Sequence, residues 1–235
     1  MDKNVLVLKV GGSIMYDQLL NVNFEVFKKI KVWYHEQEEK YDKIVFVTGG
    51  GGLSRSVQES IIEDIGGEDN FHSIAMSVTQ TNAAIFSSYL DDKQIFVPRT
   101  LGEAYEFLID SGERVMVSGG LKMGWSTDMD AAVFADTLGT DRVFKISNID
   151  YVYDKDPKEF FDAKPIKDMT WKDYFKIFDI VEGEQHGPNR NMPISVESAQ
   201  YCARKKISFL ITGGKFLEEE EKVSKILQKG TFIHP

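Results

Sequence analysis

The sequence has 235 residues, a formal net charge of -9, and 42% hydrophobic and 28% charged residues. These values indicate a globular protein rather than a disordered or membrane-spanning one, because no apolar run approaches the roughly 18 residues that a membrane helix needs. The acidic balance disfavours nucleic acid as a partner. The single Cys202 excludes an intramolecular disulfide framework. The apolar stretch at the start is too short for a signal peptide, so we expect a cytoplasmic protein.

Short apolar segments rich in β-branched residues alternate with segments of helical periodicity from the first residues to the last. The segments at 5–10, 43–48, 114–118, 142–146 and 208–212 predict buried strands. Helices are expected at 24–39, 53–65, 74–90, 101–109, 128–138, 196–205 and 217–227, with a short one near 171–178 inside the irregular stretch 151–191. This alternation predicts an α/β fold, a three-layer αβα sandwich around a mainly parallel sheet. No linker is visible, so we expect residues 1–235 to form a single domain.

The 19 glycines are unevenly distributed along the chain. Four clusters, at 11–12, 49–52, 119–120 and 213–214, directly follow predicted strands. Glycine at a strand end allows a sharp turn that exposes backbone N–H groups, and such groups hold an anion without any positive side chain. The pattern predicts binding of small phosphorylated molecules at the carboxyl ends of the strands.

Lys9 is the single charge in the first predicted strand and lies just before Gly11 and Gly12. A lysine at a strand end often extends to water. A lysine beside exposed amides is also what phosphoryl transfer requires, because positive charge and hydrogen-bond donors stabilise the transferred group. Neither a P-loop nor a dinucleotide-binding glycine motif follows this strand.

The second glycine cluster precedes a predicted helix that carries Arg55 about one turn from its start. Amides at a helix N-terminus and a guanidinium fork together favour anion binding, although four glycines alone could be a flexible loop.

Two later segments each allow a structural and a functional interpretation. In the segment 119–128, helix capping explains Ser126, Thr127 and Asp128, and Trp125 could stack on a base or cover the core. In the segment 147–157, the Asp and Asn residues could form turns. Tyr153 and Asp156 could instead contact an adenine and a ribose.

Together these segments resemble the amino acid kinase family, and within it the archaeal-type UMP kinases. The motifs are VLKVGGSIM, VTGGGGLSR, VTQTNA, GGLKMGWSTDMDAA, ISNIDYVYDKDPKEFFDAKPI and the closing GTFIHP. They stand in the family's order and cover nearly the whole chain. The resemblance implies ATP-dependent phosphorylation of UMP to UDP by a homo-oligomer, usually a hexamer, with an acceptor side in residues 1–140 and an ATP side in residues 141–235.

The resemblance also implies roles for individual residues. Lys9 would stabilise the transferred group, and Asp128 is the second catalytic candidate. Mg²⁺ would bridge the ATP phosphates with few protein ligands, so no metal ligand is assigned to the chain. ATP would contact Gly11, Gly12, Ser13, Ser147, Asn148, Tyr153 and Asp156. The acceptor nucleotide would contact Gly50, Gly51, Arg55, His72, Gly120, Ser126 and Thr127.

Three positions depart from the family pattern. His72 and Ser195 stand where an Asp is usual, and Tyr151 replaces a Gly. The acceptor ribose and base are therefore less well supported than the phosphate loops. Alternatives are a family kinase for another small phosphorylated acceptor, an oxoanion-binding protein like the molybdenum storage protein, or a catalytically silent nucleotide-binding protein.

Overall fold

The structure is a computed structural model that describes residues 4–92, 94–110, 112–181, 183, 192–215 and 229–235. Its helices are α1 (Phe24–Gln37), α2 (Gly51–Ile61), α3 (Glu68–Leu90), α4 (Leu101–Asp110), α5 (Thr127–Leu138), α6 (Trp171–Ile177) and α7 (Val196–Lys205), with 3-10 turns η1 (Gly12–Ile14) and η2 (Glu38–Lys40). Its strands are β1 (Val5–Val10), β2 (Lys43–Thr48), β3 (Ile95–Phe96), β4 (Val115–Ser118), β5 (Arg142–Ser147), β6 (Val152–Tyr153), β7 (Pro165–Ile166), β8 (Asp168–Thr170), β9 (Ser208–Gly213) and β10 (Thr231–His234). Among these described helices, none is both long and apolar enough to cross a membrane.

Eight of the strands form one sheet in the order β3-β4-β2-β1-β5-β9-β10-β8. The six strands from β3 to β9 are mutually parallel, whereas β10 runs antiparallel to β9. Parallel strands place their carboxyl ends at one edge of the sheet, which is where ligands bind in open α/β folds. The prediction of a mainly parallel sheet is confirmed.

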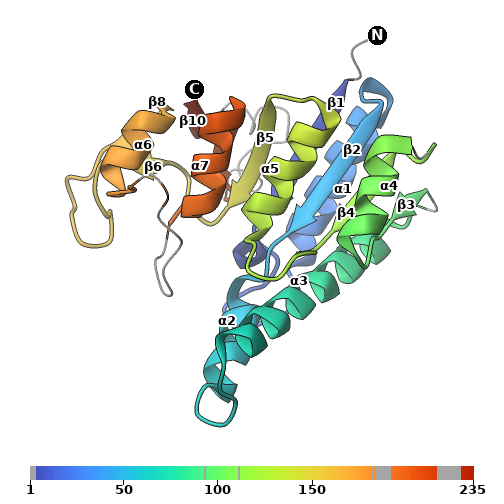
Figure 1. The fold of residues 1–235 in the computed structure, drawn as a ribbon, viewed down its shortest axis with the longest axis horizontal. Coiled ribbons are helices and arrows are strands. Elements are labelled where there is room, and N and C mark those ends of the chain that lie inside the picture. The colour runs from blue at the N-terminus through green and yellow to red at the C-terminus, as the bar shows by residue number, and fades with distance from the viewer. Residues whose placement is uncertain (1–3, 93, 111, 182, 184–191, 216–228) are drawn as a thin grey trace.

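Helices cover both faces of this sheet (Figure 1). Successive residues of a strand point to opposite faces. On β1, Leu6 and Leu8 join a core with residues of α1 and α3, whereas Val7 joins a second core with residues of α4, α5, α6 and α7. The three-layer αβα sandwich predicted from the sequence is therefore confirmed.

The five predicted strands and most of the predicted helices are present, with shifted boundaries at two helices. α2 begins at Gly51, and α3 begins at Glu68 rather than at Ile74. The strands β3, β6, β7, β8 and β10 were not predicted, because two to four residues carry too little periodicity to be distinguished from a loop. The helix expected at 217–227 lies outside the described residues.

Candidate active site

The first two glycine loops touch each other at the carboxyl edge of the sheet. A Cβ atom added to Gly12 would lie 2.3 Å from the backbone nitrogen of Gly51 and 2.4 Å from the carbonyl oxygen of Gly49. Gly51 itself has a φ of +61°, which glycine adopts without strain. The glycines at these positions are required because backbone packs directly on backbone, and the loops expected to bind donor and acceptor phosphates lie side by side.

Backbone hydrogen bonds fix these loops to the ends of neighbouring strands. The Gly11 N–H donates to the carbonyl oxygen of Ile146 at 2.7 Å, and the Gly49 N–H donates to Val10 at 3.0 Å. The Gly214 N–H donates to the carbonyl oxygen of Ser147 at 2.6 Å. The N–H of Gly11 is thus engaged within the protein, and Gly11 shapes the loop that presents Gly12 and Ser13.

Helix α3 holds the second glycine loop through Asn82. The Asn82 amide donates to the Gly49 carbonyl oxygen at 2.7 Å and accepts a hydrogen bond from the Tyr16 hydroxyl at 2.5 Å. Asn82 is fully buried. Tyr16 follows η1, so Asn82 also connects the first glycine loop to the second.

The same helix holds the third glycine loop. The Gly120 N–H donates to the Thr79 hydroxyl oxygen at 2.7 Å, and the Gln80 side chain donates to the Gly120 carbonyl oxygen at 3.1 Å. The sequence alone assigned no role to the individual residues of the motif VTQTNA. The signal that could have identified them is the presence of polar residues on a helix that packs against the core, because buried polar groups require hydrogen-bond partners.

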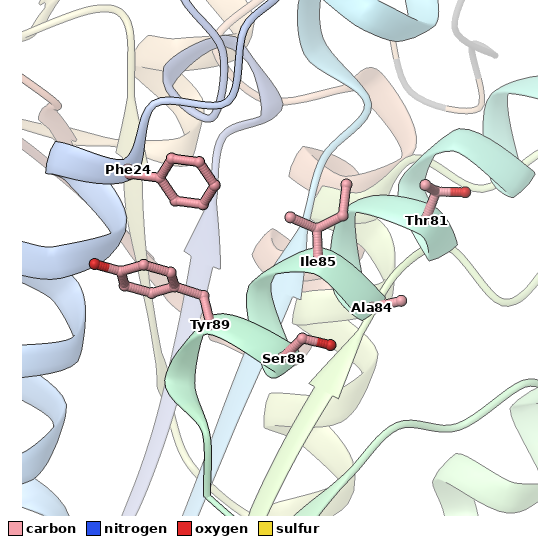
Figure 2. Close-up of a pocket in the computed structure, with 6 residues that line it drawn as sticks. All are labelled: Phe24, Thr81, Ala84, Ile85, Ser88 and Tyr89. Carbon is pink, nitrogen blue, oxygen red and sulfur yellow. The ribbon is translucent and has the colours of Figure 1, made fainter.

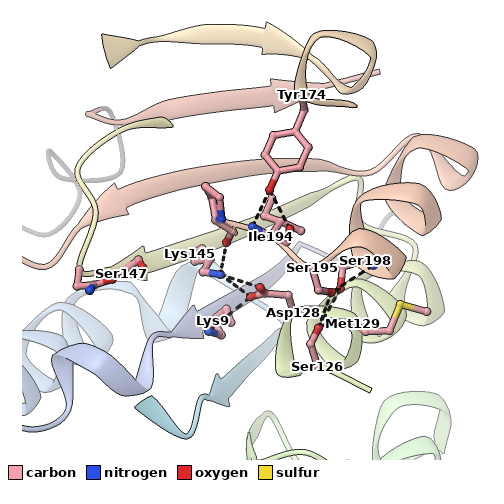
Figure 3. Close-up of polar contacts among 12 residues, drawn as sticks. Lys9, Ser126, Asp128, Met129, Lys145, Ser147, Tyr174, Ile194, Ser195 and Ser198 are labelled. Carbon is pink, nitrogen blue, oxygen red and sulfur yellow. Dashed lines mark hydrogen bonds and ion pairs between the residues drawn. The ribbon is translucent and has the colours of Figure 1, made fainter. Parts of the chain in front are cut away.

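A buried lysine–carboxylate network joins β1, β5 and the start of α5 (Figure 3). Lys9 of β1 and Lys145 of β5 occupy paired positions on adjacent strands, and both approach Asp128 at the start of α5. The Lys145 Nζ donates to the two Asp128 carboxylate oxygens at 2.8 and 2.7 Å, and the Lys9 Nζ lies 3.5 Å from Oδ1. All three side chains are buried. The sequence had named Lys9 and Asp128 but not Lys145.

The electrostatics of this network follow from its burial. Burial alone would raise the pKa of Asp128, but Lys145 and Lys9 outweigh it and hold that pKa below its usual range. Burial lowers the pKa of Lys145 to about 8 although Asp128 opposes the shift, and the charge of Lys9 adds to the lowering. Asp128 is therefore ionised at neutral pH, in contact with two ammonium groups.

Three serine hydroxyls connect the starts of α5 and α7. Ser126 is the N-cap of α5 and Ser195 is the N-cap of α7. Their hydroxyl oxygens are 2.8 Å apart, and that of Ser198 lies 2.6 Å from Ser195 and 3.1 Å from Ser126. Ser195 thus acts as a helix cap at the position where the family pattern has an Asp.

The remaining predicted acceptor residues are partly or fully open to solvent. Arg55 lies exposed on α2, which packs against α3, and His72 lies exposed on α3. Thr127 is half-buried at the first turn of α5. Within the described residues, no hydrogen bond or ion pair joins Arg55 to the second glycine loop.

The predicted adenosine residues lie around the end of β5 and in the segment that follows. Ser147 ends β5 and is buried, and Asn148 after it is exposed. Tyr153 is half-buried on β6. The Asp156 carboxylate accepts a hydrogen bond from the Lys158 N–H at 2.8 Å, which is the turn-forming role that the sequence also allowed.

The described donor groups do not form a resident magnesium site. No group of three or more His, Cys, Asp or Glu in the described part of the chain is placed to hold a metal ion. Asp128, the carboxylate nearest Lys9, directs both oxygens at Lys145.

A separate surface pocket of about 480 Å³ lies between the start of α1 and α3 (Figure 2). Its lining is mainly apolar and includes the half-exposed Phe24 with Ile85 and Tyr89. None of its lining residues belongs to a glycine loop or to the lysine network, so it is not part of the site described above.

Comparisons with known proteins agree with the fold. The model of the amino acid kinase family matches residues 4–213. A uridylate kinase of Staphylothermus marinus is 31% identical over 235 residues, covering 99% of both chains. The structure of an Archaeoglobus fulgidus uridylate kinase aligns with a TM-score of 0.74 and 26% identity, covering 98% of this chain and 99% of the other. That of an Ureaplasma parvum UMP kinase aligns over the full length of both chains with a TM-score of 0.76, and at 16% identity it supports the fold alone.

Proposed function

The chain belongs to the amino acid kinase family, and we propose that it is a nucleoside monophosphate kinase that transfers the γ-phosphoryl group of ATP to UMP. The observation that carries this proposal is the buried Lys9, which lies 3.5 Å from Asp128 at the junction of two glycine loops. The uridylate kinase relatives, which match nearly the whole chain, support the choice of acceptor.

The two touching glycine loops would hold the two reacting phosphates. Gly12 and Ser13, with Gly11 shaping their loop, would face the ATP phosphates. Gly50 and Gly51 start α2, and the first N–H groups of a helix have no partner within the helix, so they suit the phosphate of UMP. The contact between the loops supports a short transfer distance.

The transfer would be an in-line displacement at the γ-phosphorus. An oxygen of the UMP phosphate forms the new P–O bond as the bond to the β–γ bridging oxygen breaks, and ADP leaves with the electron pair. The attacking oxygen is already ionised at neutral pH, so no general base is required. Lys9 stabilises the charge on the transferred group, and Mg²⁺ would enter bound to the ATP phosphates.

Further residues would place the two nucleosides. Ser147, Asn148, Tyr153 and Asp156 would surround adenosine on the ATP side, residues 141–235. On the acceptor side, residues 1–140, UMP would contact Arg55, His72, Gly120, Ser126 and Thr127. His72 in place of the usual Asp leaves another small phosphorylated acceptor as the second candidate.

We further propose one domain over residues 1–235, a cytoplasmic location and assembly into a homo-oligomer, a hexamer by family resemblance. Light scattering after size-exclusion chromatography measures the oligomeric state directly, and a monomer would contradict this part of the proposal.

An ADP-release assay tests the proposed reaction with UMP, CMP, dUMP and AMP as acceptors. We expect UMP to give the highest kcat/KM. If no nucleoside monophosphate raises the rate above that of ATP alone, the proposal is wrong, and a rate with another phosphorylated acceptor would support the second candidate.

Lys9→Ala tests the role of Lys9. We expect kcat to fall by about 10²-fold or more, because the ammonium acts mainly in the transition state. Lys43→Met is the matched control, because Lys43 is also a buried strand lysine but donates to the carbonyl oxygens of Phe107 and Glu113 at the far end of β2. An unchanged kcat in Lys9→Ala would show that another group carries the transfer.

A further inference from the structure

We propose that Lys145 is a positioning residue that neutralises Asp128 and thereby leaves the positive charge of Lys9 available to the phosphates. The inference rests on the proposed function of Lys9. It explains why a protein that must hold two anionic substrates places a buried carboxylate beside its candidate catalytic lysine.

The hydrogen bonds of Lys145 show that it acts within the protein. A lysine ammonium has three N–H donors. Lys145 directs its donors to the two oxygens of Asp128, at 2.8 and 2.7 Å, and to the carbonyl oxygen of Pro193, at 2.6 Å. No donor is left for a phosphate, so Lys145 is not a second phosphate ligand.

The Pro193 carbonyl oxygen is itself held in position. The hydroxyl of the buried Tyr174 donates to the carbonyl oxygen of Ile194 at 2.8 Å and accepts from the Ile194 N–H at 2.8 Å (Figure 3). This pair of hydrogen bonds anchors the residue next to Pro193. Lys145 is therefore held between the hydrogen-bonded backbone at Pro193 and Ile194 and the first turn of α5.

Lys9 is bound less tightly to the carboxylate. Its Nζ lies 3.5 Å from one Asp128 oxygen, compared with 2.7 Å for Lys145. The same Nζ would lie 3.1 Å from a Cβ added to Gly49, so it borders the second glycine loop. Lys9 thus faces both the carboxylate and the proposed phosphate site, and Lys145 takes the stronger contacts with the carboxylate.

The charges of the three side chains make the inference testable. Two ammonium groups and one carboxylate give this cluster a net charge of +1. Lys145→Met would reduce the net charge to zero and leave Asp128 to pair with Lys9 alone. The double variant Lys145→Met, Asp128→Asn would restore +1 with Lys9 unpaired. A purely structural role for Lys145 predicts that the melting temperature falls in the single variant and recovers in the double variant, while the kcat of the folded protein stays the same in both.

The experiment measures kcat, KM and the melting temperature of these variants. We expect Lys145→Met to lower kcat by about 10²-fold, in the range for loss of a transition-state donor, and the double variant to be at least about tenfold faster than Lys145→Met because the two changes are coupled. Lys43→Met is the control for removing a buried lysine outside the site, and we expect its kcat to stay within about twofold of the wild type. An unchanged kcat in Lys145→Met, or a double variant no faster than the single one, overturns the proposal.

Two further arms keep the result decisive. If Lys145→Met does not fold, the double variant alone decides, and a loss of kcat as large as that of Lys9→Ala overturns the proposal. If the wild type phosphorylates no acceptor, the proposed function fails, and calorimetric titration with ATP tests the positioning role separately. The proposal then requires ATP affinity to fall in Lys145→Met and to recover in the double variant, and equal affinities overturn it.

Discussion

Gly12→Ala tests the contact between the two glycine loops most directly. The added Cβ would lie 2.3 Å from the nitrogen of Gly51, 2.4 Å from the oxygen of Gly49 and 2.5 Å from the carbonyl carbon of Gly50. All three are backbone atoms, so no side chain can rotate away. Since close-packed interiors hold carbon contacts near 3.5 Å, the two loops must separate by about 1 Å.

This displacement would act on both reacting phosphates at once. A misplacement of about 1 Å can cost about 10²-fold in rate, because in-line transfer depends on alignment. Overpacking a tight contact costs about 1–3 kcal/mol of stability. In a protein of this size each kcal/mol lowers the melting temperature by about 2–4 °C, so Gly12→Ala should remain folded and lose most of its activity.

The assay is ADP release at saturating ATP and UMP, with a thermal melt of the same samples. Gly52→Ala is the matched control, because a Cβ there would meet only the end of the Leu20 side chain, at 3.3 Å. We expect the control to keep its kcat. If Gly12→Ala also keeps its kcat while melting normally, the loops do not jointly position the substrates and the reasoning is refuted.

Two further predictions concern buried polar side chains. Asn82→Ala removes the donor to Gly49 and the acceptor for Tyr16. We expect the free energy of unfolding to fall by about 1–3 kcal/mol and the KM for UMP to rise. Unchanged kinetics would contradict the role of Asn82 in holding the loop. Asp130 is buried with no hydrogen bond of normal geometry to its carboxylate oxygens, and burial with the nearby Asp128 raises its pKa to about 7, which the Leu121 N–H offsets only in part. The folded protein therefore binds a proton more tightly than the unfolded chain between about pH 4 and 7, so stability falls as pH rises through that window. Asp130→Asn should raise the free energy of unfolding in urea more at pH 8 than at pH 5, and an equal change at both pH values would contradict this.

The sequence predicted the parts of this protein that depend on local pattern. β-branched segments followed by glycine gave the parallel strands and their loops, and Lys9 was identified because one charge stood in an apolar strand. Lys145 is the penultimate residue of the predicted strand 142–146, as Lys9 is of the predicted strand 5–10, and the register pairs the two lysines. That repeated position was a signal in the sequence, but only the order of the strands shows that the two lysines are neighbours.

Other features depend on contacts between distant segments. Asn82 and Thr79 read as polar residues of a helix until the fold places them against Gly49 and Gly120. Ser195 read as a lost carboxylate, and the structure shows it capping α7 beside Ser126. Side-chain hydrogen bonds across 30 to 70 residues leave no periodicity in the sequence, so pattern alone could not predict them.

The distribution of charge shows how an acidic protein could hold the two nucleotides proposed as its substrates. With a net charge of -9, the molecule as a whole repels polyanions, so attraction must be local. The buried cluster of Lys9, Asp128 and Lys145 contributes +1 in a low-dielectric setting, where a charge acts more strongly than at the surface. The glycine loops add backbone N–H groups, which bear no net charge. A Cβ atom on the glycines would keep the two loops from packing this closely. Under the proposed function, a buried cluster of small positive charge beside packed backbone would favour a compact phosphate over an extended polyanion.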